Sequence, residues 1–127
     1  PERHARVEAD IRLVERALSN LIDNAINYTP EGGAVCVRLD NEQDEVCVEV
    51  ADTGPGIPED DLPHIFERFY RVDKSRDRDK GGAGLGLAIA KTILELHGRS
   101  LEVESTVGEG TTFRFRLPIE AAAAQRA

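Results

Sequence analysis

The spacing of apolar residues predicts three helices. In two stretches, residues 11–26 and 85–96, apolar side chains recur at steps of three and four, which is the period of a helix with one buried face. The first stretch follows Asp10, a residue type that caps helix N-termini, and the second ends before Gly98, since glycine commonly follows a helix C-terminus. A run of the same spacing over residues 62–69 predicts a shorter helix.

Alternation of apolar and polar residues predicts strands in five other stretches, because one face of each strand is then buried. These stretches are residues 5–9, where the alternation is weak, 35–39, 46–50, 101–103 and 113–119. The hydrophilic residues 40–45 predict a loop that joins two antiparallel strands, and residues 108–110 predict the turn of a closing hairpin.

Length and charge narrow the class of protein. The 127 residues suit a single domain, residues 1–127, and the formal net charge of −8 argues against nucleic acid or an anionic membrane surface as a partner. No run approaches the roughly 18 apolar residues of a membrane-spanning helix, so we expect a cytoplasmic domain without direct membrane contact. Cys36 and Cys47 are too few for a zinc cage and are expected to be half-buried in strands.

Two segments are not expected to pack against the core. Residues 71–84 are rich in charged residues and glycine, and they cannot bury enough apolar surface to become ordered. Residues 120–127 form a tail of mostly small residues, which we expect to be disordered. The chain contains no Met and begins with Pro1, which indicates that it is part of a longer product.

Three asparagines, Asn20, Asn24 and Asn27, form a stripe on the first predicted helix, about opposite its apolar face. Asparagine is a weak helix former, and an ordinary solvated face favours Glu, Lys or Arg. A carboxamide oxygen can ligate Mg²⁺ without adding negative charge beside phosphates. From these residues alone, a metal and phosphate site and a solvated face both remain open.

Two glycine-rich loops are candidates for nucleotide binding. Asp52 ends a valine-rich strand where the loop 52–58 begins, a usual ligand position in α/β folds, and its carboxylate could accept a hydrogen bond from an exocyclic amine. Residues 81–87 lead into a helix, so that backbone N–H groups and the helix N-terminus could cradle phosphates. Taken alone, the first loop is also explained as a turn and the second as a hinge.

Five motifs in this order resemble the N, G1, F, G2 and G3 boxes of sensor histidine kinases. They are residues 20–30, 52–57, 66–71, 82–89 and 108–113, and the resemblance covers about residues 5–119. It implies the ATP-binding catalytic domain of a bacterial two-component sensor histidine kinase with the Bergerat (GHKL) fold. That fold is a two-layer α/β sandwich, in which about three helices cover one face of a mixed sheet of about five strands. A flexible ATP lid is implied at about residues 71–84.

The resemblance also implies a role for each matching position. Asn24 would ligate Mg²⁺, Asn20 would lie close to the phosphates, and Asp52 would bind the adenine amino group. Arg71 would offset charge on the transferring phosphoryl group, which makes it, with Asn20, a catalytic candidate. The other implied ATP contacts are Tyr28 and Ile57 at the ring, Gly54, Gly56 and, through water, Thr111 at the base, and Asn27, Gly82, Gly84, Leu85, Gly86 and Leu87 at the phosphates.

Two positions bear on the chemistry. Asn27 stands where the family commonly carries Lys or Arg, which removes a charge from the phosphate contacts. Asn20 stands where related ATPases carry a Glu general base; a carboxamide cannot take a proton, so transfer is favoured over hydrolysis. His4, His64 and His97 lack the acidic neighbour and helical-hairpin context of a phosphoacceptor, and each is expected at the surface or at a helix end.

The resemblance therefore implies that the chain binds Mg-ATP and donates the γ-phosphoryl group to a histidine on a separate dimerisation domain of the same kinase. This chain alone is expected to be monomeric and not to phosphorylate itself. A response regulator would be an indirect partner, and the parent protein would be anchored in the plasma membrane. Two alternatives stay open: a stand-alone anti-sigma-type serine kinase, which Asn20 disfavours, and a catalytically degenerate nucleotide-binding module, which Asn27 motivates.

Overall fold

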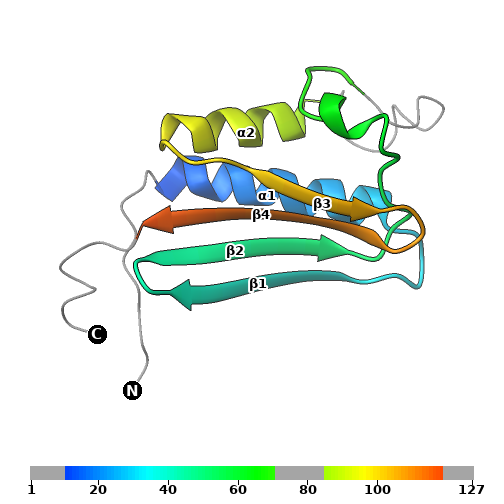
Figure 1. Cartoon of the computed structure of the whole chain (residues 1–127), viewed down its shortest axis with the longest axis horizontal. Helices are drawn as coiled ribbons and strands as arrows, with labels where there is room; N and C mark the ends of the chain where they lie inside the picture. Colours follow the sequence, from blue (N-terminus) through cyan, green and yellow to red (C-terminus); the bar gives the residue numbers. More distant parts are fainter. Residues whose placement is uncertain (1–10, 71–84, 119–127) are drawn as a thin grey trace.

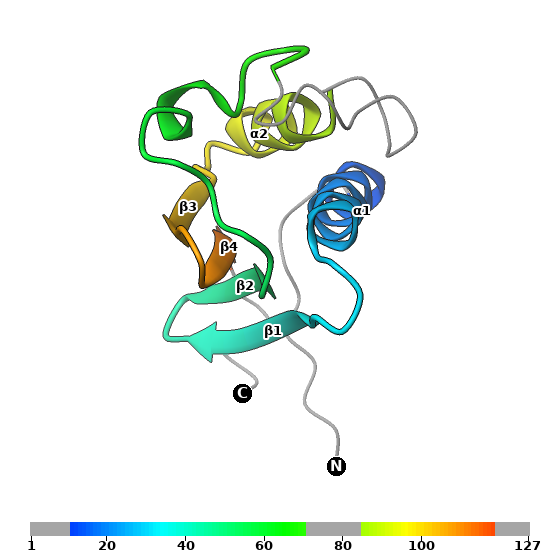
Figure 2. The ribbon, with the colours of Figure 1, turned by 90° about the vertical axis from the view of Figure 1, so that its right-hand side faces the viewer.

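The computed structural model describes residues 11–70 and 85–118, which fold into two layers. One layer is a four-stranded sheet, and the other contains two helices that both lie on one face of it (Figure 1 and Figure 2). In chain order the elements are α1 (Ile11–Tyr28), β1 (Val35–Glu42), β2 (Glu45–Asp52), the one-turn 3₁₀ helix η1 (Leu62–His64), α2 (Gly86–Leu96), β3 (Glu102–Thr106) and β4 (Gly110–Pro118). The predicted two-layer α/β sandwich is confirmed. No helix in the described ranges is long and apolar enough to cross a membrane.

The strands lie in the order β1-β2-β4-β3, and each of the three pairings is antiparallel. The expected mixed sheet of about five strands is therefore represented in the described residues by four antiparallel strands, of which β1–β2 and β3–β4 are hairpins. The expected strand at residues 5–9 lies outside the described residues, as do the lid at 71–84 and the tail at 120–127.

The first hairpin is longer than the sequence pattern predicts. The loop expected at residues 40–45 shortens to a two-residue turn at Gln43 and Asp44, because cross-strand pairing continues to the ends of β1 and β2. Val37 and Leu39 were expected on the buried face, yet they are 43% and 66% exposed, since β1 is an edge strand of the described sheet.

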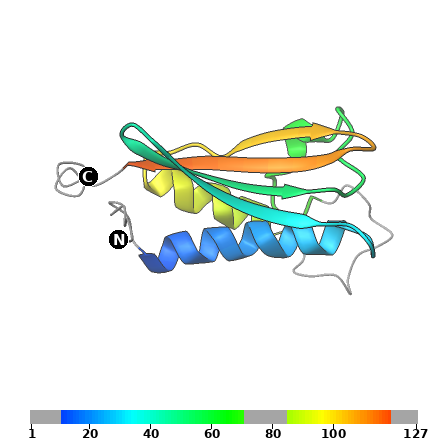
Figure 3. The same ribbon diagram turned by 90° about the horizontal axis from the view of Figure 1, so that it is seen from below.

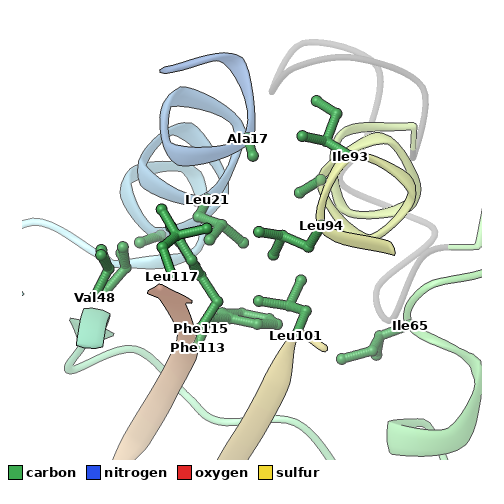
Figure 4. Packing of buried hydrophobic residues seen from close by; sticks show 13 residues of the cluster. Ala17, Leu21, Val48, Ile65, Ile93, Leu94, Leu101, Phe113, Phe115 and Leu117 are labelled. Atoms are coloured by element: carbon green, nitrogen blue, oxygen red, sulfur yellow. The ribbon is translucent and has the colours of Figure 1, made fainter. Parts of the chain in front are cut away.

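Apolar side chains from both layers form one core between the helices and the sheet (Figure 4). Its main members are Ala17, Leu21 and Ala25 from α1, Ala90, Ile93 and Leu94 from α2, and Val48, Val50, Phe113, Phe115 and Leu117 from the sheet. The helical members recur at three- and four-residue steps and the strand members alternate, as the sequence predicts. Figure 3 shows α1 running along the length of the strands, so this packing fixes both ends of α1 relative to the sheet.

The opposite face of the sheet carries ion pairs. Arg114 of β4 donates from Nη1 to Glu104 Oε1 at 2.8 Å and from Nε to Glu49 Oε2 at 2.6 Å, and Arg116 similarly joins Glu42 and Glu102. The hydrogen bonds to Glu104 and Glu49 raise the pKa of the Arg114 guanidinium. The exposed pairs of this face contribute at most about 1 kcal/mol each, and the part-buried Arg114–Glu49 pair adds to them, so the apolar, helix-covered face supplies most of the stability of the domain.

Both cysteines lie on this outer face by strand alternation, and both thiols are free. Cys47 is buried and Cys36 is exposed, so the expectation that both are half-buried is wrong. Burial raises the pKa of the Cys47 thiol, because the thiolate form loses its hydration.

The predicted helix at residues 62–69 is wrong as an α-helix. Only Leu62–His64 form a turn of 3₁₀ helix, and Phe69 has a φ angle of +67°, which is incompatible with right-handed helix. The apolar spacing still identifies core side chains, because Ile65 is buried and Phe66 packs edge-on against Phe113 with ring centroids 6.2 Å apart. Phe69 is 64% exposed and does not belong to the core.

Candidate functional site

The candidate site lies at the end of the sandwich where several loops meet. Figure 1 shows the C-terminal end of α1, the end of β2 and the β3–β4 turn together at this end, with the first turn of α2 directed toward it. The sequence-predicted residues in the described part of the chain fall into two groups there, one around Asp52 and one around Asn20. Arg71, Gly82 and Gly84 lie outside the described residues.

Asp52 is the last residue of β2, and its side chain is buried although it carries a carboxylate. Its Oδ1 accepts a hydrogen bond from the backbone N–H of Gly54 at 2.8 Å, which turns the chain sharply into the glycine-rich loop. Among the described residues, the bonds found for this carboxylate occupy Oδ1 only. The other oxygen remains available as an acceptor for a ligand N–H group.

Backbone packs directly against backbone around Asp52, which explains why two neighbouring positions are glycine. A Cβ at Gly110 would lie 2.0 Å from the Asp52 carbonyl oxygen, and a Cβ at Gly54 would lie 2.7 Å from the carbonyl oxygen of Tyr28. No side chain fits at either distance. The second contact joins the end of α1 to the Asp52 loop.

A row of polar side chains crosses the sheet from Asp52. Asp52 pairs in register with Thr111 on β4, and Thr111 pairs with Ser105 on β3. Thr111 is buried, and its Oγ1 lies 2.8 Å from Ser105 Oγ, which also accepts the Ile57 N–H at 2.7 Å. Sequence reasoning identified Asp52, Ile57 and Thr111 but missed Ser105, because the only signal for Ser105 is its cross-strand pairing with Thr111.

The loop that carries Ile57 is fixed to the β3–β4 hairpin by three contacts. Besides the bond from Ile57 to Ser105, the N–H of Gly108 donates to the Pro55 carbonyl at 2.9 Å. Gly56 has φ +79°, and a Cβ there would lie 2.4 Å from the Thr106 carbonyl oxygen. Gly56 is therefore required both by its backbone conformation and by this close approach.

The second group lies between α1 and α2. Asn20, Asn24, Asn27 and Tyr28 of α1 are all partly buried, so the asparagine stripe is not an ordinary solvated face. The Nδ2 atom of Asn20 is buried and has no hydrogen-bond partner in the described part of the chain. A buried amide without a partner is unfavourable by about 1–3 kcal/mol, which favours a ligand acceptor at this place.

The start of α2 faces Asn20. A Cβ at Gly86 would lie 3.8 Å from Asn20 Cβ, an ordinary contact distance, so this glycine is not required by packing between the described residues. Leu85 is the N-cap position of α2, and Leu87 packs against the core. The free N–H groups of the first helical turn make this end of α2 suited to an anion.

The described residues contain neither a cluster of metal-ligating side chains nor a histidine among the candidate site residues. No cluster of three or more His, Cys, Asp or Glu side chains with metal-binding geometry occurs within residues 11–70 and 85–118. His64 is exposed and pairs with Glu67 at 2.7 Å, while His97 follows the C-terminus of α2 with Nδ1 2.8 Å from the Ile93 carbonyl oxygen. These positions confirm the surface and helix-end locations expected for both residues; His4 lies outside the described residues.

The architecture and the two groups define an α/β sandwich with an acceptor for an amine and donors for an anion at one end. A family model described as histidine kinase-, DNA gyrase B-, and HSP90-like ATPase matches residues 9–121, and the chain belongs to this ATPase family.

Individual proteins of known function or structure are similar to the chain. The sensor histidine kinase WalK of Bacillus subtilis is 48% identical over 120 residues, which cover 93% of this chain and 20% of that protein. The solved mycobacterial sensor histidine kinase MprB has a TM-score of 0.78 at 36% identity, covering 90% of this chain and 77% of that one. Full-length ShkA in complex with AMPPNP gives 0.76 at 33% identity, covering 93% and 24% respectively. The chain spans about a fifth of the length of the curated relatives it matches.

Proposed function

We propose that the chain binds ATP with Mg²⁺ and donates the γ-phosphoryl group to a histidine on a separate dimerisation domain of the same kinase. The observation that carries this proposal is a pair of buried polar groups at one end of the sandwich, the Asp52 carboxylate and the Asn20 amide, which has no partner among the described residues. The family match and the sensor histidine kinases among the relatives support it. A solved relative in complex with AMPPNP supports a nucleotide as the ligand.

The group around Asp52 suits the base of the nucleotide. The second Asp52 oxygen, Oδ2, would accept a hydrogen bond from the exocyclic amine, and Thr111 would act beside it through water. Tyr28 and Ile57 would contact the ring, and Gly54 and Gly56 leave room for its edge because they lack side chains.

The group around Asn20 suits the phosphates and the metal ion. The Asn20 amide would donate to a phosphate oxygen, which satisfies its missing hydrogen bond, and the Asn24 carboxamide oxygen would ligate Mg²⁺. Magnesium would supply charge neutralisation of the triphosphate. Asn27, Leu85, Gly86 and Leu87 would complete the phosphate contacts, together with Arg71, Gly82 and Gly84 outside the described residues.

Transfer is favoured over hydrolysis by the chemistry of Asn20. A water nucleophile needs a base, and a carboxamide cannot accept its proton at neutral pH, whereas a neutral imidazole attacks without prior deprotonation. Phosphoryl transfer then depends mainly on positioning and on nearby positive charge. The same observation disfavours a serine kinase, because a serine hydroxyl must lose a proton to a base.

Nucleotide binding is tested by thermal unfolding in the presence of ATP and Mg²⁺. At a hundredfold excess over Kd, binding to the folded form alone adds about 2.7 kcal/mol of stability, which raises the melting temperature. Asp52→Asn removes most of this increase, because the carboxamide replaces one acceptor oxygen by a donor. Asp40→Asn, an exposed aspartate on β1, is the matched control and keeps the full shift. No shift for the wild type at millimolar ATP would contradict the proposed binding of ATP.

Phosphoryl transfer is tested with ATP labelled on the γ-phosphate. The chain alone should retain no acid-labile label, and addition of a dimerisation domain with its histidine should place label on that domain. Replacement of that histidine by alanine is the control. Stable label on this chain alone would contradict the proposal. In the parent protein, which we propose is anchored in the plasma membrane, the phosphohistidine would then serve a response regulator.

A further inference from the structure

We infer that Ser105, to which neither the motifs nor the family match assigns a role, is a positioning residue that sets the selectivity of the site for the base. The inference rests on the proposed binding of an adenine nucleotide. Ser105 occupies the end of the row that begins at Asp52 and continues through Thr111, one residue on each of three neighbouring strands. Residues paired in register share one face of the sheet, so Ser105, through its hydrogen bond to Thr111, can affect the hydroxyl that lies beside Asp52.

The hydrogen bonds of Ser105 leave its proton only two positions. Its Oγ lies 2.7 Å from the Ile57 N, 2.8 Å from Thr111 Oγ1 and 3.1 Å from the Gly110 carbonyl oxygen. The amide can only donate and the carbonyl can only accept, whereas a hydroxyl has one proton and two lone pairs. Ser105 therefore accepts from Ile57 and gives its own proton either to Gly110 or to Thr111.

The two positions give Thr111 opposite roles. If Ser105 donates to Gly110, the Thr111 hydroxyl donates to Ser105 and offers only lone pairs to its other neighbours. If Ser105 donates to Thr111, the Thr111 proton is free and can be directed to another acceptor. Ser105 thus decides whether Thr111 is an acceptor or a donor beside Asp52.

The donor arrangement matches the edge of adenine. The exocyclic amine of adenine donates, which suits Asp52, and the neighbouring ring nitrogen accepts, which needs a donor directly or through one water. In hypoxanthine the order is reversed, since the 6-oxygen accepts and the adjacent ring N–H donates. With hypoxanthine, the Asp52 carboxylate would face the 6-oxygen, acceptor against acceptor, and a donating Thr111 would face the ring N–H, donor against donor. A row in which Thr111 is the donor therefore selects adenine.

Ser105 also fixes the loop that borders the base. Its bond from Ile57 lies beside the close approach of Gly56 to the Thr106 carbonyl oxygen, so the loop and β3 are held together at two successive residues. Loss of the hydroxyl would leave the Ile57 N–H without its acceptor and the Thr111 hydroxyl without a fixed direction. Both effects act on the same side of the base.

The test compares binding of adenosine diphosphate and inosine diphosphate, each with Mg²⁺, to wild type and to S105A, S105T and S100A. We expect S105A to lower the affinity for adenosine diphosphate about fivefold, the equivalent of one neutral hydrogen bond, and the affinity for inosine diphosphate by less than about twofold. S105T keeps a hydroxyl and should restore the wild-type ratio of affinities. Ser100 is exposed and outside the strands, so S100A is the matched control.

A second readout needs no nucleotide. The amide proton resonance of Ile57 should move upfield in S105A, because its acceptor is removed, and should stay near its wild-type position in S105T. Equal loss of both nucleotides in S105A, with the ratio unchanged, would show that Ser105 only supports the fold and would overturn the inference. Wild-type protein that binds neither nucleotide would instead overturn the proposed function, and this inference with it.

Discussion

The two halves of the candidate site are built differently. Around Asp52, the carboxylate accepts the Gly54 N–H, the Ser105 hydroxyl bonds to the Thr111 hydroxyl and to the Ile57 N–H, and glycines allow backbone to touch backbone. Around Asn20, a buried amide has no partner among the described residues, and the neighbouring Gly86 has space beside it. The group around Asp52, for which we propose base binding (the base half), is therefore preformed, with one Asp52 oxygen left as an acceptor. The group around Asn20, for which we propose phosphate binding (the phosphate half), contains a donor that the described residues leave without an acceptor.

This difference separates recognition of the base from binding of the phosphates. A preformed base half loses little conformational freedom on binding, which favours affinity and selectivity. A phosphate half with an unpaired donor gains a hydrogen bond only when an acceptor is present, so its contribution appears only in the bound state. Substitutions that disturb the close packing of the base half should consequently lower the stability of the unliganded protein, whereas substitutions in the phosphate half should mainly change the stabilisation by ligand.

The largest expected effect is that of Gly110→Ala. The new Cβ would lie 2.0 Å from the Asp52 carbonyl oxygen, so β2 and β4 must separate locally, and we expect a loss of more than about 3 kcal/mol in the free energy of unfolding. Urea denaturation measures it.

Gly108→Ala, in the same hairpin, is the matched control for this clash. Gly108 also has a positive φ, +88°, but a Cβ there meets nothing within 4 Å. Only the strain of a left-handed backbone remains, about 1–2 kcal/mol. Equal losses at the two positions would show that the base half is not closely packed.

Asn20→Ala should have the next largest effect on stability, and whether the variant is more or less stable than the wild type should depend on the presence of nucleotide. Without nucleotide, removal of a buried unpaired amide leaves the stability unchanged or raises it, since no hydrogen bond is lost. With ATP and Mg²⁺, the stabilisation by ligand should fall by about 1.5–3 kcal/mol, the range for a hydrogen bond to a charged group. Thermal unfolding with and without ligand measures both. Ser19→Ala, exposed on the same helix, should change neither; a large loss of unliganded stability in Asn20→Ala would contradict an unpaired amide.

The sequence predicts some features of the candidate site and not others, because some depend on residues close together in the sequence and others on residues far apart. Helical and strand periods are local, so they identify α1, α2 and four strands, and the motifs identify Asp52 and Asn20. Ser105 depends on pairing between β3 and β4 and on a bond to residue 57, which no local pattern contains. That the Asn20 amide is buried without a partner among residues 11–70 and 85–118 depends on tertiary packing and is likewise not contained in a local pattern.

The segment at residues 62–69 shows the same division. Its apolar spacing correctly identifies Ile65 and Phe66 as side chains that pack on the core, but the spacing does not determine the backbone. The backbone instead forms a single 3₁₀ turn before Ile65, and Phe69 has a positive φ and is 64% exposed. Periodicity therefore predicts which side chains are buried more reliably than which backbone conformation buries them.

Asn27→Lys should strengthen binding of ATP by the phosphate half. The family resemblance implies a basic residue at this position, and an added ammonium group near the triphosphate should raise ATP affinity about threefold to fivefold at low salt. The gain should shrink as salt screens the charge, with a Debye length of about 8 Å at 0.15 M. Titration calorimetry at two ionic strengths measures it. Ser19→Lys adds the same charge on the exposed face of α1 and should give no comparable gain; an equal gain would show a non-specific effect of net charge.

Gly86→Ala should change the free energy of unfolding least, and in the opposite direction from Gly110→Ala. Its Cβ would lie 3.8 Å from Asn20 Cβ, and no positive φ occurs at this position, so the unliganded protein has nothing to displace. Alanine restricts the unfolded chain, which should raise the free energy of unfolding by about 0.5 kcal/mol. The same methyl group occupies space beside Asn20 that we assign to phosphate, so ATP affinity should fall severalfold while stability rises. Urea denaturation and calorimetry on one variant measure the two quantities. A destabilisation as large as that of Gly110→Ala would mean that the phosphate half is packed as tightly as the base half, and the distinction between them would be lost.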